Sequence, residues 1–218
     1  MQSVEYKAKL TFTEPLLGSS PGNPELLEDY ISSKAPTLAA AKEELEAAMV
    51  PGEIEKATTI FPRDEHGVFL WDYQIRGSFK EALAVLVELG ETTTPGKWMV
   101  KKAVDCLLFV SPRRCYLLDE FGKKITGKLP TRQRSLRATT MQGDRIAIAS
   151  SEQVPPGTFI EFNVKLLIAN GKSKKGAESS MKIQEETIEA CIAYNASRGF
   201  GQWRSGGFGR FGYELKKL

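Results

Sequence analysis

The sequence predicts an α+β fold, in which an antiparallel sheet of the split βαβ type carries its helices on one face. Three observations predict it. Segments with strand-like alternation and segments with helical spacing of apolar residues are both present. They follow one another as strand, helix, strand pair, strand, helix, strand. The chain of 218 residues, 41% of them hydrophobic, is also long enough to bury a core, so we expect one domain over residues 1–218 with two insertions.

The first strand is predicted at residues 4–12, where apolar residues alternate with charged or polar ones. After it, Asn23 followed by Pro24 is typical of a helix start. A second helix is expected from Thr37, in a run rich in Ala, Glu and Lys. Together these two helices make up a predicted helical insertion near residues 22–52.

The first core helix is predicted to begin at Ser78, because Ser78 and Glu81 have the spacing of a capping box, and to end at Gly90. A short strand near residues 58–61 and extended structure at residues 68–73 precede it. A further short helix is expected near residues 98–104, followed by two strand segments on either side of Pro112.

A basic insertion is predicted near residues 120–145. Residues 122–143 have few apolar side chains and no acidic one, which indicates an exposed loop or hairpin. Its six basic residues are Lys123, Lys124, Lys128, Arg132, Arg134 and Arg137. The net charge is −7 over residues 1–100, +7 over residues 101–145 and +3 over residues 146–218. This distribution fits either a positive face for a polyanion or a basic patch that pairs with the acidic section.

The last part of the chain repeats the strand and helix patterns. Residues 159–168 alternate like the first strand, and residues 183–192 have the apolar spacing of a helix that Gly199 ends. A final strand is expected near residues 210–215. With the insertions left aside, the order of elements is that of a ferredoxin-like (RRM-like) sheet.

A glycine-rich stretch, GFGQWRSGGFGRF, lies between that helix and the final strand. Glycines let backbone amides approach an anion closely, arginines add charge, and aromatic rings add surfaces for stacking, so a phosphate backbone would fit. The alternative is a glycine-rich hairpin that packs Phe200 and Phe208 into the core. The residues that would serve an anion are Gly199, Gly201, Trp203, Arg204, Gly207, Gly209 and Arg210.

This stretch has the form GhGxxxxxGhG, with an aromatic residue at each h and Arg204 as the basic residue among the five between. It resembles the C-terminal signature of the RAMP superfamily, the ferredoxin-like RNA-binding proteins of CRISPR effector complexes. Two further stretches are similar to the backbone-subunit branch of that family, VPPGTFIEFNVKLL and IRGSFKEALAVL. The second similarity implies that Arg76 and Lys80 lie beside the nucleic acid.

The resemblance implies a non-catalytic protein that binds single-stranded RNA through the glycine-rich stretch and the basic insertion, with Arg132, Arg134 and Arg137 folding over the strand. It also implies self-assembly or a place in a CRISPR-type or other defence assembly. The chain is similar, too, to phage proteins of this length. That similarity leaves a second hypothesis open, a phage anti-defence protein that sequesters a nucleotide or mimics a CRISPR subunit.

A third hypothesis is a RAMP-type endoribonuclease. In members that cut RNA, an early loop aspartate or a histidine carries the chemistry. The single histidine, His66, is the candidate general base, although its setting, RDEHG, is typical of a polar turn. The acidic residues in the corresponding part of the chain are Glu53, Glu55, Asp64 and Asp72.

The composition argues against a metal site, a disulfide framework and a membrane protein. One histidine and three widely spaced cysteines provide neither a zinc-site pattern nor a disulfide framework, so we expect no metal, no cofactor and buried free thiols. No apolar run reaches the roughly 20 residues that span a bilayer, and the first ten residues are too charged for a signal peptide. We therefore expect a cytoplasmic protein that does not contact a membrane.

Overall fold

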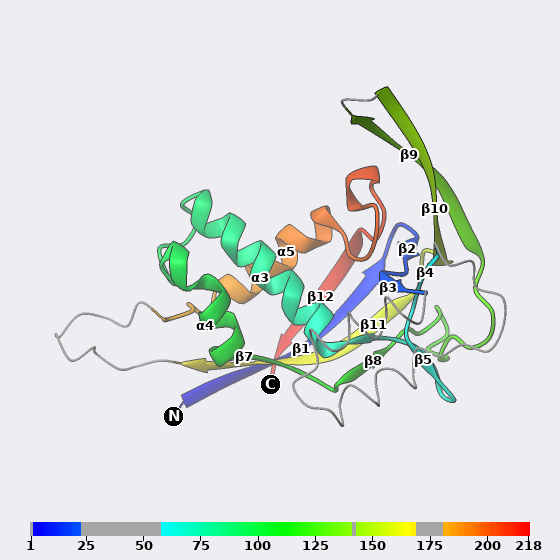
Figure 1. Cartoon of the computed structure of the whole chain (residues 1–218). Coiled ribbons are helices and arrows are strands. Elements are labelled where there is room, and N and C mark those ends of the chain that lie inside the picture. Colours follow the sequence, from blue (N-terminus) through cyan, green and yellow to red (C-terminus); the bar gives the residue numbers. More distant parts are fainter. Residues whose placement is uncertain (1, 23–57, 141–142, 169–180) are drawn as a thin grey trace, which may run out of the picture.

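The computed structural model describes residues 2–22, 58–140, 143–168 and 181–218. Its main sheet has four antiparallel strands in the order β12-β1-β11-β7. These strands are β1 (Gln2–Phe12), β7 (Leu108–Ser111), β11 (Phe159–Ile168) and β12 (Phe211–Lys217). Three helices cover one face of this sheet (Figure 1), and they are α3 (Asp72–Glu88), α4 (Val100–Leu107) and α5 (Thr187–Arg198).

The predicted fold class is confirmed. The chain runs β1, α3, β7, β11, α5, β12, and the strands of this split βαβ pair take the order fourth, first, third, second across the sheet. This is the ferredoxin-like arrangement. Because the last strand pairs with the first, the connection between α5 and β12 is placed at one end of the sheet, beside the chain that leaves β1.

Alternation along the two central strands builds the core. Ala8 and Leu10 of β1 stand opposite Phe162 and Ile160 of β11, and all four side chains are buried under the helices. Burying a large apolar side chain stabilises the fold by about 1.5–3 kcal/mol. The predicted strands at residues 4–12 and 159–168 are therefore confirmed, the second with its bounds unchanged.

The predicted start of the first core helix is wrong by about two turns. Helix α3 begins at Asp72, after Trp71 as N-cap, and the amide of Trp71 donates a hydrogen bond to Gln74 Oε1 at 2.8 Å. Ser78 lies inside the helix, where its hydroxyl donates to the carbonyl oxygen of Ile75 at 2.7 Å. A serine that bonds back to its own helix needs no capping role. The buried stripe extends upstream to Ile75, so packing against the sheet decides where the helix begins.

Two smaller sheets lie beside the main sheet in the part of the chain that the structure describes. One contains β2 (Leu16–Leu17), β10 (Gly143–Val154), β4 (Thr58–Ile60) and β3 (Ser20–Pro21), and β9 (Thr131–Thr140) pairs with β10. The other contains β5 (Arg63–Asp64), β6 (Gly67–Trp71) and β8 (Arg114–Tyr116). Two 3-10 turns are also present, η1 (Lys97–Met99) and η2 (Arg204–Gly206).

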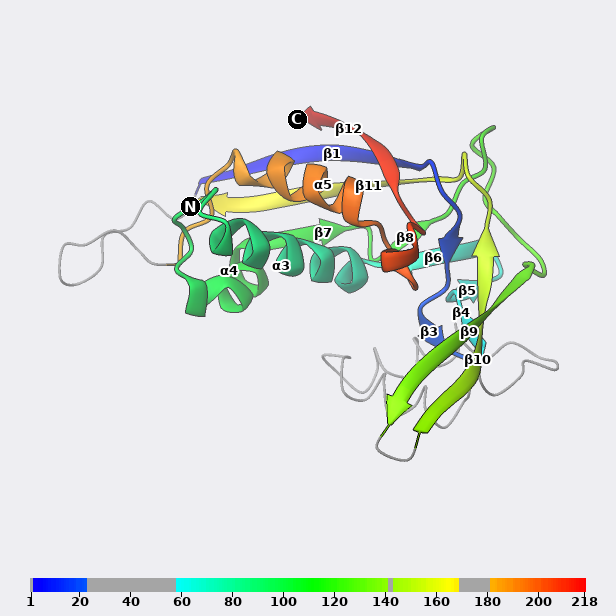
Figure 2. The ribbon, with the colours of Figure 1, turned by 90° about the horizontal axis from the view of Figure 1, so that it is seen from above.

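Strands β9 and β10 form a long antiparallel hairpin at the place of the predicted basic insertion. In both views the hairpin lies at the end of the molecule opposite α4 (Figures 1 and 2). Strand β10 also pairs with β2 and β4, which fixes the base of the hairpin next to the end of β1. The predicted helical insertion near residues 22–52 lies, except for Gly22, outside the described residues.

Of the three thiols predicted to be buried, two are. Burial raises the pKa of Cys115 to about 12, with a smaller contribution from the charge of Asp72, and burial raises the pKa of Cys191 to about 12. Cys106 is exposed, so the prediction is wrong there. The buried side of α4 follows helical spacing through residues 100, 103, 104 and 107, which turns residue 106 outward.

No helix within the described ranges is long and apolar enough to cross a membrane.

Candidate nucleic-acid interface

The glycine loop, residues 199–210, connects the end of α5 to β12. Its two Gly-Phe-Gly triplets lie backbone against backbone, and the amide of Phe200 donates to the carbonyl oxygen of Gly209 at 2.9 Å. A Cβ atom at Gly209 would lie 2.1 Å from the oxygen of Phe200, and one at Gly199 would lie 2.3 Å from the oxygen of Phe208. Both glycines also have positive φ, +70° and +86°. The close contact of the triplets thus requires glycine at these two positions.

Many amides of the glycine loop already have acceptors within the protein. The amide of Gly209 donates to the carbonyl of Pro15 at 2.9 Å, and that of Gln202 donates to Leu17 at 3.3 Å, which docks the loop on the chain after β1. The backbone of Gly201 also packs against Leu17. The loop amides that donate to backbone oxygens are those of Gly199, Phe200, Gln202, Gly206, Gly207 and Gly209. The sequence predicts that amides of this loop bind an anion. In the structure, these six amides instead donate hydrogen bonds within the protein and shape the loop.

The aromatic residues of the glycine loop point to different places. Phe200 is buried in the core, 5.6 Å from the ring of Phe211 between centroids. Trp203 and Phe208 instead stack on each other, with ring centroids 4.9 Å apart and planes 14° from parallel. The indole of Trp203 lies over Gly206, where any Cβ atom would be 2.7 Å from the ring. Trp203 remains 36% exposed. The loop therefore presents a pair of stacked rings near the surface.

Trp203 is also a strained residue. Among the described residues it is the one non-glycine with φ in the left-handed region, at 54°. A bulky side chain in this region is uncommon, and such strain costs on the order of 1–3 kcal/mol and concentrates at binding sites. The stack on Phe208 and the cover over Gly206 hold the indole in this position.

Two arginines of β9 lie over these rings. The guanidinium carbon of Arg132 is 5.1 Å from the centroid of Phe208, and that of Arg134 is 5.3 Å from Trp203. Residues two apart on a strand point to the same face about 6.6 Å from each other, so neighbouring rings meet neighbouring arginines. We call the four residues Arg132, Arg134, Trp203 and Phe208 the arginine–aromatic cluster. It joins the basic hairpin to the glycine loop.

The two arginines differ in their surroundings. Arg132 is exposed, whereas Arg134 is partly buried and its Nε and Nη1 atoms are shielded from solvent without a hydrogen-bond partner. Burial lowers the pKa of Arg134. Each buried donor left without an acceptor costs about 1–3 kcal/mol. Arg134 is thus held in place by its contact with Trp203, with part of its hydrogen-bonding capacity unused.

Other basic residues predicted for the interface have acidic partners. Arg204 Nη1 lies 2.7 Å from Glu81 Oε2 of α3, and Arg198 Nε lies 3.4 Å from the other oxygen of Glu81. Lys80 pairs with Asp105 of α4. Glu81 is a residue of this region that the sequence interpretation gave only a capping role. No pattern in the sequence shows that an acid on α3 meets a loop more than 100 residues away.

Three further candidates have separate places. Arg76 is half-buried in α3. Burial raises the pKa of Asp72, and the charges of Arg113 and Arg76 oppose this effect. Arg210 is exposed beside Gly207, with its guanidinium carbon 3.8 Å from the position of a Cβ atom there. Arg137 lies on β9 opposite Ile146, and its side chain falls outside what the structure describes.

The sheet face turned away from the helices is not a basic surface. Lysines of the two central strands pair there with carboxylates on neighbouring strands, Lys7 with Glu161 at 2.8 Å and Lys165 with Glu5 at 2.8 Å. These charges compensate one another across the register of β1 and β11. The arginine–aromatic cluster is therefore a better place for an anionic strand than the open sheet face.

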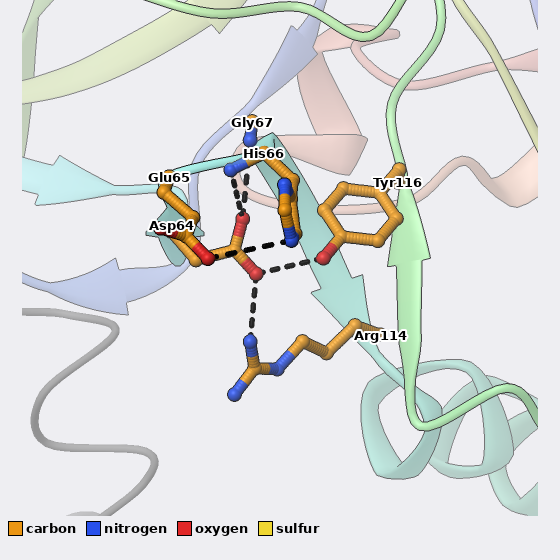
Figure 3. A network of polar contacts seen from close by, with 6 residues as sticks. All are labelled: Asp64, Glu65, His66, Gly67, Arg114 and Tyr116. Atoms are coloured by element: carbon orange, nitrogen blue, oxygen red, sulfur yellow. Dashed lines mark hydrogen bonds and ion pairs between the residues drawn. The ribbon is translucent and has the colours of Figure 1, made fainter.

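His66 and Asp64 belong to the β5–β6 turn (Figure 3). The carboxylate of Asp64 accepts hydrogen bonds from the amides of His66 and Gly67 at 2.8 and 3.1 Å, from Arg114 Nη1 at 2.7 Å and from the Tyr116 hydroxyl at 2.7 Å. Burial alone would raise the pKa of Asp64, but these bonds outweigh it and hold the pKa below its usual value. The side chain of His66 itself is exposed, and its Nε2 atom lies 3.5 Å from Oε1 of Glu65.

The Asp64 network is thus a closed structural unit. Its carboxylate is saturated by four donors and holds together β5, β6 and β8. Of the other acids near the predicted catalytic position, Asp72 lies in the first turn of α3, whereas Glu53 and Glu55 lie outside the described residues. Within the described ranges no group of three or more His, Cys, Asp or Glu side chains is placed to hold a metal ion.

Comparison with known proteins adds little at the level of sequence. No protein-family model matches the chain, and no curated protein matches it. Among solved structures, the chain is similar to a chain of the cryo-EM structure of the type III-B Cmr-beta bound to cognate target RNA, with 8% identity and a TM-score of 0.45. The similarity covers 100% of this chain and 61% of the other, so this chain spans about three fifths of its length. A TM-score below 0.5 does not establish a shared fold, and the ferredoxin-like assignment therefore rests on the strand order.

Proposed function

We propose that this protein is a RAMP-like, non-catalytic RNA-binding protein that holds single-stranded RNA at the arginine–aromatic cluster. The observation that carries the proposal is the cluster itself. Two stacked rings at the surface and two guanidinium groups are the combination that binds the bases and phosphates of single strands. The resemblance of the glycine motif to that of RAMP proteins is the reason for proposing RNA as the bound strand.

The contacts described above change the role assigned to the glycine loop. Its glycines and its hydrogen-bonded amides shape the loop, and the ion pair of Arg204 with Glu81 fastens the loop to α3. In this proposal the loop serves the RNA chiefly by presenting Trp203 and Phe208, while β9 supplies positive charge. Exposed Arg210 lies in the same loop and adds a further cation.

The test compares two double variants with equal loss of charge. Arg132→Ala/Arg134→Ala removes both arginines of the cluster, and Lys101→Ala/Lys102→Ala removes two exposed lysines of α4, at the other end of the molecule (Figure 1). Binding of single-stranded and duplex RNA is measured by fluorescence anisotropy over a range of salt concentrations, after nuclease treatment of the protein. Thermal unfolding of each variant checks that it is folded.

The proposal expects the arginine variant to lose about tenfold or more in affinity for the single strand. The slope of log K against log salt should fall by about 0.7 to 1.4, the values for one and two phosphate contacts on a single strand. The lysine variant should change little. Equal losses in the two variants, or tighter binding of duplex than of single strand, would contradict the proposal. A single small nucleotide that co-purifies and saturates the protein would favour the sequestration hypothesis instead, and RNA cleavage lost in His66→Ala would favour the endoribonuclease.

A further inference from the structure

Arg132 and Arg134 have the same charge and lie two residues apart on one face of β9, yet their surroundings differ. Arg132 is exposed, and water can solvate its donors. Arg134 has its Nε and Nη1 shielded from solvent without a partner, while its guanidinium lies over the Trp203 ring. A buried guanidinium normally meets a carboxylate, a carbonyl or another oxygen acceptor. Arg134 therefore lacks an acceptor that Arg132 does not need.

We propose that Arg134 forms a phosphate seat, in which its guanidinium edge binds a phosphodiester group of the strand while its flat face stays on Trp203. This inference rests on the proposed function and divides the work within the cluster. Arg134 makes the direct, oriented contact, and Arg132 contributes charge without a fixed partner.

The chemistry of the side chain fits this role. A guanidinium presents parallel N–H donors that match two oxygens of a phosphate, and such charge-assisted pairs are stronger than neutral hydrogen bonds. Stacking on Trp203 fixes the plane of the group, which reduces the freedom lost when a phosphate binds. Because Nε and Nη1 are shielded in the free protein, binding requires the side chain to shift along the ring, which the flexible arginine stem allows. Burial, which lowers the pKa of Arg134, also makes a nearby anion more favourable.

The experiment compares Arg134→Ala, Arg134→Lys and Arg132→Ala with the unmodified protein, using labelled oligouridylate as the probe. Arg134→Ala should weaken binding by about tenfold or more and lower the salt slope by about 0.7, the value for one phosphate contact on a single strand. Arg132→Ala should weaken binding about twofold to threefold and lower the slope by less than Arg134→Ala does. Arg134→Lys, which keeps the charge but loses the planar fork, should recover less than half of the lost affinity on a logarithmic scale.

A fluorescence measurement tests the place of the contact. The variant Trp98→Phe removes the most exposed of the three tryptophans, and Trp71 is only 2% exposed and therefore shielded from quenchers. Quenching by acrylamide in this background therefore reports the accessibility of Trp203. Oligouridylate should change the quenching of Trp203. When both proteins are equally saturated with the strand, this change should be smaller in Arg134→Ala than in the unmodified protein. Inorganic phosphate at constant ionic strength serves as the second probe.

The outcomes separate the two proposals. If the unmodified protein does not bind the strand, the proposed function fails. If it binds, but Arg132→Ala and Arg134→Ala have equal effects, or Arg134→Lys behaves like the unmodified protein, the seat is overturned and the function stands. If inorganic phosphate saturates Trp203 as tightly as the strand does, the seat belongs to a free phosphate, and its assignment to a strand is overturned.

Discussion

Glu81 of α3 and Arg204 of the glycine loop form an ion pair at 2.7 Å, across 123 positions of the chain. Both side chains are partly exposed, 35% and 27%, and Arg198 of α5 shares the same carboxylate. The pair fastens the loop to the helix layer and neutralises the basic residue of the glycine motif. The positive charge available near the glycine loop therefore comes from the arginines of β9 and from the exposed Arg210.

Replacing Glu81 should strengthen RNA binding. Glu81→Gln keeps a hydrogen-bond acceptor for Arg204 but removes the negative charge between two arginines. We expect a twofold to fivefold gain in affinity for single-stranded RNA at low salt and a loss of stability of no more than about 1 kcal/mol, because the pair is partly solvated. The control is Glu88→Gln, the same charge change farther along α3, where the partner is Lys97. An equal gain in both variants, measured by anisotropy, would show a general charge effect instead.

Replacing Gly209 should unfold the loop. In Gly209→Ala the new Cβ atom would meet the oxygen of Phe200 at 2.1 Å, with φ at +70°. We expect a loss of about 3 kcal/mol or more in the free energy of unfolding, measured by urea denaturation. Gly212→Ala is the matched control in the following strand, since no atom lies within 4 Å of its Cβ position. Similar midpoints for the two variants would argue against the backbone contact of the triplets.

Asp64 should make stability depend on acidity. Its pKa is lower in the folded protein than in the unfolded chain, so its contribution is fully present above the unfolded pKa of about 3.9. The contribution is lost as the pH falls through the lower, folded pKa. Asp64→Asn should cost about 2 kcal/mol at pH 7, because buried donors lose a charged acceptor, and should flatten the decline in acid. Glu65→Gln, at a side chain that is 85% exposed, is the control. At each pH between 3 and 7, its urea midpoint should equal that of the unmodified protein.

The thiols should react in two classes. Cys106 is exposed, whereas Cys115 and Cys191 are buried with their pKa raised to about 12. A thiol reagent should therefore modify a single cysteine quickly in the native protein, and all three only in denaturant, since the thiolate is the reactive form. Cys106→Ser should abolish the fast phase. A fast phase that persists in this variant would mean that one of the other two thiols is accessible.

The periodic elements of this fold could be predicted because their side chains alternate with burial. Strands β1 and β11 show the pattern directly, and the order of elements gave the ferredoxin-like class. The start of α3 could not be predicted in this way. Ser78 has the residue type and spacing of a cap, but the buried position of Ile75 extends α3 upstream, and no local signal reports that packing.

For the candidate site, the residues themselves could be identified from the amino-acid sequence: a glycine motif with Trp203, Phe208 and Arg204 inside it, and a basic segment without acids that includes Arg132 and Arg134. Their arrangement in space could not. The fold brings β9 onto the rings of the loop and pairs Arg204 with Glu81. The physical reason is that these contacts join segments about 70 to more than 100 positions apart, and such pairings depend on sheet register and helix packing, which leave no periodic trace in the chain.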